Sequence, residues 1–182
     1  MATGFSISTF RSKALAGEGA RANLFDVLMT LPTIAGLTTN EMTYTVKAAQ
    51  LPGSTVTAID VPYFGRVVKV PGNKTFENWT VTVINDENFV VRNAMEKWIA
   101  SMGSHEGNLV VAGGLQYGTA QVMQYSKQGG GAIQTYQFEK IFPVSVAAID
   151  LAWDSNDTIE DFAVEFAFDY WTSVKGSTAV VS

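Results

Sequence analysis

Polar and hydrophobic residues alternate with a period of two along much of the chain, which is typical of strands with one buried face. In the first such stretch, Phe25, Val27 and Met29 take one side, and Asp26 and Thr30 take the other. The same pattern predicts seven further strands, over residues 42–47, 66–70, 76–84, 119–127, 133–142, 147–153 and 161–171. Many short strands predict a mainly β fold, a single-domain antiparallel β-sandwich or barrel.

One stretch follows the helical period instead. Within residues 86–102 the apolar side chains fall on one helical face, at Val91, Ala94, Met95, Trp98, Ile99 and Met102. Asn85 is the expected N-cap, and Asp86 and Glu87 suit the positive end of a helix dipole. The sequence therefore predicts one α-helix, closed by Gly103.

Three segments depart from the strand pattern. Residues 1–21 are small and polar, and they predict a flexible N-terminal arm with little core of its own. Residues 173–182 are predicted to form a C-terminal tail, which leaves 22–172 as the domain. Residues 51–65, LPGSTVTAIDVPYFG, are predicted to form a long ordered loop, because prolines do not fit a central strand. Long ordered loops are usually functional. Pro71-Gly72-Asn73 is expected to be a turn.

Composition narrows the function classes. The 182 residues suit one domain, and 47% of them are hydrophobic, which excludes wholesale disorder. Only 16% are charged, so much of the surface is expected to meet protein. No apolar run reaches the ~20 residues of a membrane-spanning helix, and the start shows no secretory signal. The net charge of −5 argues against a protein that grips duplex DNA.

Candidate chemistry is sparse. The chain has no cysteine and one histidine, His105, expected in an exposed loop, so neither thiolate catalysis nor a multi-histidine metal site is available. Residues 154–158 suggest a calcium loop, but its sixth position is Ile159 rather than glycine. Residues 72–75 have the letters of a phosphate loop without its upstream glycine. We therefore expect no catalytic residues, no metal and no cofactor.

Four blocks of the sequence carry a family resemblance. They are ARANLFDV (20–27), KAAQLPG (47–53), GRVVKVPGNKTFENWTVTVINDE (65–87) and LAWDSNDTIEDFAVEFAFDYW (151–171). Together, and in this order, they resemble the tail tube proteins of contractile-tailed, myovirus-type bacteriophages. Residues 104–131 match nothing in that pattern.

The resemblance implies a structural virion protein rather than an enzyme. Its copies would form hexameric rings whose inner strands join into one inter-subunit β-barrel. The rings would stack into a hollow tail tube. The protein would be in the host cytoplasm during assembly and in the virion tail afterwards, and it would not contact a membrane. The implied partners are further copies, the contractile sheath, the baseplate and the tail terminator. DNA would leave through the lumen without specific binding, which suits an acidic chain.

Two other interpretations stay open on the sequence. The chain could be the tube of a phage-tail-like bacteriocin or of a type VI secretion system, because these differ in cargo and genome context. From another class, it could be a monomeric β-sandwich that binds a small ligand. An enzyme is the most distant alternative.

The family's strand order assigns three candidate surfaces. The loop 51–65 would contact the adjacent ring through its apolar residues Val56, Ile59, Val61, Tyr63 and Phe64. The alternative is that this loop folds back on its own domain. The lumen would be lined by Thr43, Thr45, Lys47, Thr135, Gln137 and Glu139, with Glu139 neutralising Lys47 while Tyr136, Phe138 and Phe142 face the core. The sheath would contact an acidic stripe made of Asp161, Glu165 and Asp169. The alternatives are that this stripe is exposed to solvent with no partner, or that it lines the lumen.

Overall fold

A computed structural model describes residues 6–13, 15, 19–37, 39–103, 117–127, 129, 131–154 and 158–175. The strands in this part of the chain are β1 (Phe25–Thr30), β2 (Val46–Ala49), β3 (Thr55–Tyr63), β4 (Arg66–Thr75), β5 (Trp79–Ile84), β6 (Gly118–Tyr125), β7 (Ala132–Val146), β8 (Asp161–Ala167) and β9 (Tyr170–Lys175). The helices are α1 (Ile7–Lys13), the 3-10 turn η2 (Thr33–Ala35), α2 (Thr39–Thr45) and α3 (Val90–Met102).

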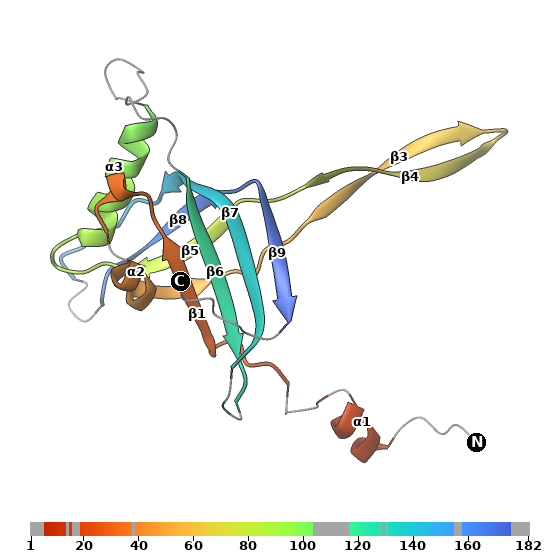
Figure 1. Cartoon of the computed structure of the whole chain (residues 1–182), viewed down its shortest axis with the longest axis horizontal. Coiled ribbons are helices and arrows are strands. Elements are labelled where there is room, and N and C mark those ends of the chain that lie inside the picture. Colours follow the sequence, from red (N-terminus) through yellow and green to blue (C-terminus); the bar gives the residue numbers. More distant parts are fainter. Residues whose placement is uncertain are drawn as a thin grey trace.

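Seven of the strands form one antiparallel sheet that folds over at β7 (Figure 1). The first part of β7 pairs with β6 and β9, and its last residues pair with β8. This makes two layers that share β7: layer 1 is β1–β6–β7–β9, and layer 2 is β7–β8–β5–β2. The predicted mainly β, antiparallel fold is confirmed.

The bend in β7 has a local cause. Gly118 pairs with Ile141 and Ala120 pairs with Phe138, so two residues of β7 face the single residue between them on β6. One of the two, Lys140, has a positive φ of 55°. An extra residue of this kind is a β-bulge, which bends a strand and sharpens its twist.

Aromatic residues from both layers fill the space between them. Trp79 of β5 is 2% exposed and stacks on Phe138 of β7, with ring centroids 4.4 Å apart. Phe166 of β8 lies 5.7 Å from Trp79 and 6.4 Å from Trp98 of α3. The core therefore joins both layers to the helix.

The helix has the predicted buried face but a later start. Val91, Ala94, Met95 and Trp98 are buried as expected. However, α3 begins at Val90, and its N-cap is Phe89 in the left-handed region rather than Asn85. Asp86 caps from further back, since its Oδ1 accepts a hydrogen bond from the Val90 amide at 3.0 Å. The side chain of Asn85 instead donates to Glu160.

The predicted strand 42–47 is wrong. Residues up to Thr45 belong to α2, and β2 begins only at Val46. Met42 is fully buried, Val46 is half-buried and Tyr44 is exposed. Met42 and Val46 are four positions apart, and one helical turn brings such positions to the same side. The burial of these two residues therefore fits a helical turn as well as it fits the alternation that predicted a strand.

The C-terminal part differs from its prediction in two places. Residues 147–153 form no strand, and residues 161–171 are two strands rather than one. The break at Phe168-Asp169 separates β8, which pairs with the end of β7, from β9, which continues in the same direction along the first part of β7. β9 then continues to Lys175, so the first residues of the predicted tail 173–182 pair with β7.

At the other end, α1 buries no residue, and no helix in the described ranges is long and apolar enough to cross a membrane.

Candidate assembly interface

β3 and β4 form a separate two-stranded hairpin that extends away from the sheet, drawn in yellow in Figure 1. The predicted loop 51–65 is therefore wrong: most of it is β3, and the predicted turn at Pro71 lies inside β4. The actual turn is Phe64-Gly65, where both residues have positive φ, as tight two-residue hairpin turns require. A ribbon of two strands is all edge, and prolines are tolerated on edges.

The two faces of the hairpin differ in chemistry. Directly opposed residues share a face, and one face carries the apolar pairs Ile59–Val70 and Val61–Val68. The other face carries the pair Asp60–Lys69, whose carboxylate and ammonium groups lie 3.4 Å apart, beside the apolar pair Pro62–Val67. The hairpin thus presents apolar side chains on both faces, with an ion pair on the second face, and has no core of its own.

Every residue of β3 is exposed, and Phe64 at the tip is 90% exposed. The five predicted loop contacts are all exposed, although Val56 alternates onto the opposite face from Ile59 and Val61. Isolated two-stranded hairpins are at best marginally stable in water. Fully burying a side chain such as valine or isoleucine is worth about 1.5–3 kcal/mol. This surface is therefore suited to being covered by another molecule.

The root of the hairpin is held firmly. Lys74 lies over the rings of Phe76 and Trp171, 5.0 and 5.5 Å from their centroids. The indole of Trp171 also donates a hydrogen bond to the carbonyl of Gly53. These contacts tie both strands to layer 1 through β9.

A bulge lies just beyond the root. Thr57 faces two residues of β4, Gly72 and Asn73, because pairing shifts between Val56 and Ala58. A Cβ atom on Gly72 would approach the Thr57 carbonyl oxygen to 2.8 Å, so glycine is needed there.

The outer face of layer 1 carries polar side chains of β7. Phe138 is buried, as the register prediction required, so Thr135, Gln137 and Glu139 alternate onto the other face. Across the pairing register Gln137 lies opposite Gln121 of β6, and its amide donates to Glu139. Beyond the bulge the register of β7 shifts, and Ile141 rather than Phe142 is fully buried.

The other three predicted lumen residues do not lie on that face. Thr43 and Thr45 belong to α2, and Lys47 belongs to β2 in layer 2. Lys47 forms its ion pair with Asp161 rather than with Glu139. Sequence reasoning placed Lys47 and Asp161 on opposite walls, and that assignment is wrong because β2 and β8 flank β5 in the same layer.

The acidic stripe is shorter than predicted. Asp161 and Glu165 alternate with buried Phe162, Val164 and Phe166 along β8, so they share the outer face of layer 2. Asp169 lies after β8, where its carboxylate meets the Lys140 ammonium at 3.0 Å. The hydrogen bond from Asp169, together with its charge, raises the pKa of Lys140.

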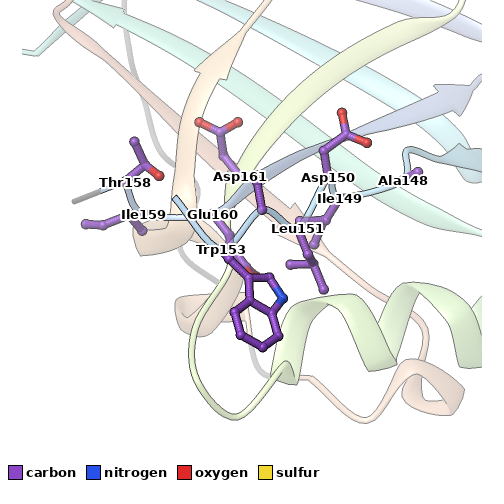
Figure 2. A pocket seen from close by; sticks show the side chains of 10 residues that line it. Ala148, Ile149, Asp150, Leu151, Trp153, Thr158, Ile159, Glu160 and Asp161 are labelled. Carbon is purple, nitrogen blue, oxygen red and sulfur yellow. The ribbon is translucent and has the colours of Figure 1, made fainter. Parts of the chain in front are cut away.

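Sequence reasoning missed one surface, a depression of about 430 Å³ between β7 and β8, lined by residues 148–153 and 158–161 (Figure 2). Its wall includes the exposed apolar residues Leu151, Trp153 and Ile159, next to Asp150 and Glu160. We call it the β7–β8 depression. Its signal in the sequence was the apolar pair Leu151 and Trp153, which imitated strand alternation.

Within the described ranges no group of three or more His, Cys, Asp or Glu residues could hold a metal ion. His105 and residues 155–157 of the calcium-like stretch lie outside those ranges.

Comparison with known proteins agrees with this geometry. The phage tail tube protein family matches residues 20–174. The tail tube protein gp19 of Enterobacteria phage T4 is 36% identical over 157 residues, which cover 85% of this chain and 92% of the relative. Its counterpart in Enterobacteria phage T6 is 35% identical over the same shares.

Among solved structures, one chain of the sheath-tube complex of an extracellular contractile injection system has a similar fold. The TM-score is 0.61 at 16% identity, over 94% of this chain and 99% of that one. A chain in the cap that terminates the tube of the anti-feeding prophage gives 0.63 at 18% identity, over 86% and 91%. The extent of the sequence matches shows that this chain belongs to the phage tail tube protein family.

Proposed function

We propose that this chain forms hexameric rings that stack into the inner tube of a contractile phage tail, through which DNA leaves. The observation that carries the proposal is the β3–β4 hairpin, an ordered ribbon with a row of exposed apolar side chains and no core beneath it. Such a surface is costly in water and is covered when copies assemble.

Ring closure would use layer 1. Among the described residues, β1 pairs only with β6 and β9 pairs only with β7, so each offers an open edge. Pairing β9 of one copy with β1 of the next would join the layers into one barrel and remove exposed edges.

The barrel would then turn the outer face of layer 1 toward the lumen. That face presents Thr135, Gln137 and Glu139. These hydroxyl, amide and carboxylate groups offer DNA phosphates no cationic partner. Because contacts of Lys and Arg with phosphates supply much of a protein's affinity for DNA, such a wall would bind the passing DNA weakly.

Stacking would use the hairpin. We expect Ile59, Val61, Tyr63 and Phe64 to pack on a copy in the adjacent ring. Val56 lies near the root, on the other face, and would contribute less.

Layer 2 would face outward, toward the sheath. The acids Asp161 and Glu165 would meet basic side chains of the sheath through exposed ion pairs, each worth about 0.2–1 kcal/mol. Structures of similar fold come from a sheath-tube complex, a baseplate and a tube-terminating cap, which supports matching partners here. Assembly would take place in the host cytoplasm.

A pair of double variants tests the proposal. Val61→Lys with Val68→Lys places charge on the apolar face of the hairpin, where the two residues are directly opposed. The control, Asp60→Asn with Lys69→Gln, removes the ion pair from the other face. Electron microscopy should show long tubes from the control and none from the first variant, while both keep the circular dichroism of the native fold. Normal tubes from the first variant would overturn the role of the hairpin, and a wild-type chain that stays monomeric would overturn the proposed tube.

A further inference from the structure

The β7–β8 depression gathers three strongly exposed apolar side chains. Leu151 and Ile159 are more than three-quarters exposed, and Trp153 is fully exposed. In Figure 2 the indole of Trp153 projects from this connection near the pale-green helix α3. The depression lies next to the start of α3, because Ile159 also lines a second hollow together with Phe89.

The depression also carries negative charge. Asp150, Glu160 and Asp161 are among the residues that line it. Lys47 pairs with Asp161, and Glu160 accepts a hydrogen bond from the neutral amide of Asn85, so the charge is only partly compensated. An occupant that fits would bring aromatic surface and a cationic group.

The tip of the β3–β4 hairpin has that chemistry. Tyr63 and Phe64 pack edge to face, with ring centroids 4.7 Å apart, and both are exposed. Arg66 lies directly opposite Tyr63, and it has no ion pair among the described residues. The tip therefore offers two aromatic rings and one guanidinium group.

We propose that the hairpin tip of a second copy occupies the β7–β8 depression. Tyr63 and Phe64 would pack against Leu151 and Trp153, while Arg66 would face Asp150 and Glu160. This inference rests on the proposed function and names the surface that receives the hairpin.

The positions of the two surfaces favour this pairing. In Figure 1 the hairpin leaves the body on the side away from α3, whereas the depression lies beside α3. One chain thus carries complementary surfaces on different sides, which is the arrangement of a head-to-tail contact. Repeated head-to-tail contacts that do not close into a ring produce an open helical stack.

Cysteine cross-linking tests the contact directly, because the chain has no cysteine of its own. One preparation carries Phe64→Cys and another carries Trp153→Cys, and the two are mixed, assembled and oxidised. A disulfide needs Cα atoms within about 7 Å. A cross-linked dimer should therefore form in the mixture and should be absent when either preparation is oxidised alone. The control mixture pairs Phe64→Cys with Thr172→Cys on β9.

The outcomes separate this inference from the proposed function. Tubes that assemble normally but yield no dimer from the Phe64→Cys and Trp153→Cys mixture would overturn the inference and leave stacking by the hairpin intact. Dimers from Phe64→Cys alone would overturn it in favour of tip-to-tip contact. Tubes that persist in the Val61→Lys, Val68→Lys variant would count against the hairpin itself.

A charge exchange gives a second measurement where cysteine variants assemble poorly. Arg66→Glu should abolish long tubes, and combining it with Asp150→Arg and Glu160→Arg should restore them. The triple variant would remain unassembled if the tip instead met another surface, such as a segment of the sheath, and that result would overturn the inference.

Discussion

The two antiparallel parts of this molecule differ in where their stability comes from. In the body, Trp79 of β5 is 2% exposed and its ring stacks on Phe138 of β7. In the hairpin, Phe64 is 90% exposed, and both faces of β3 meet solvent. The hydrogen-bonding pattern is the same, but only the body buries the apolar area that offsets the entropy of ordering the chain. The body therefore has a core that can stabilise it alone, whereas the hairpin gains buried apolar area only if another molecule covers it.

Removing the central indole should give the largest effect. Trp79→Ala is expected to lower the free energy of unfolding by about 3–5 kcal/mol, as for other large core truncations. Phe64→Ala is expected to change it by less than about 0.5 kcal/mol, since the ring touches no core. Urea unfolding of dilute, unassembled protein measures both. Equal losses in the two variants would mean that the hairpin tip packs on its own domain.

Gly118 in the body and Gly72 in the hairpin are both closely packed. A Cβ atom on Gly118 would lie 2.8 Å from the Thr30 carbonyl oxygen and 3.1 Å from the Trp98 ring. Gly118→Ala should therefore cost about 1–3 kcal/mol through overpacking of the core. Gly72→Ala meets an equally short contact in the hairpin bulge and should reduce tube length while thermal unfolding of the body stays unchanged. Loss of body stability in Gly72→Ala would contradict the separation of the two parts.

The smallest effect on stability is expected on the outer face of layer 2. Asp161→Lys with Glu165→Lys should alter the free energy of unfolding by no more than about 1 kcal/mol, because exposed ion pairs contribute little. Bare tubes should form normally, and sheath assembly around them should be impaired. The matched control reverses two exposed acids elsewhere, Glu77→Lys with Glu96→Lys. Normally sheathed tails from the Asp161→Lys, Glu165→Lys variant would show that these two acids do not contribute to the contact with the sheath.

The sequence predicted the elements that bury one face. β5 and β8 show strict alternation, and Trp79, Val81, Phe162 and Val164 are buried as that alternation indicated. The same rule failed for β3, because the hairpin buries neither face and its prolines imitate a loop. Alternation records burial within one chain, so it does not detect strands whose partner is another molecule.

The positions of the candidate residues were predictable to the same extent. The place of Thr135, Gln137 and Glu139 on the outer face of layer 1 followed from the burial of Phe138, and their role in a lumen stays a prediction. Lys47 was misplaced because pairing partners are set by topology: β2 and β8 are far apart in sequence but flank the same strand. The β7–β8 depression was missed because Leu151 and Trp153 alternate as a strand would, although they lie in an exposed connection.

A cryo-EM map of tubes assembled from the purified chain would show whether neighbouring copies cover the hairpin. We predict that the β3–β4 hairpin of every copy is covered by a neighbouring copy, with Ile59, Val61 and Phe64 buried at that contact and layer 1 lining the channel. A map in which the hairpin projects into solvent, or folds back on its own domain while the tube stays intact, would contradict the account.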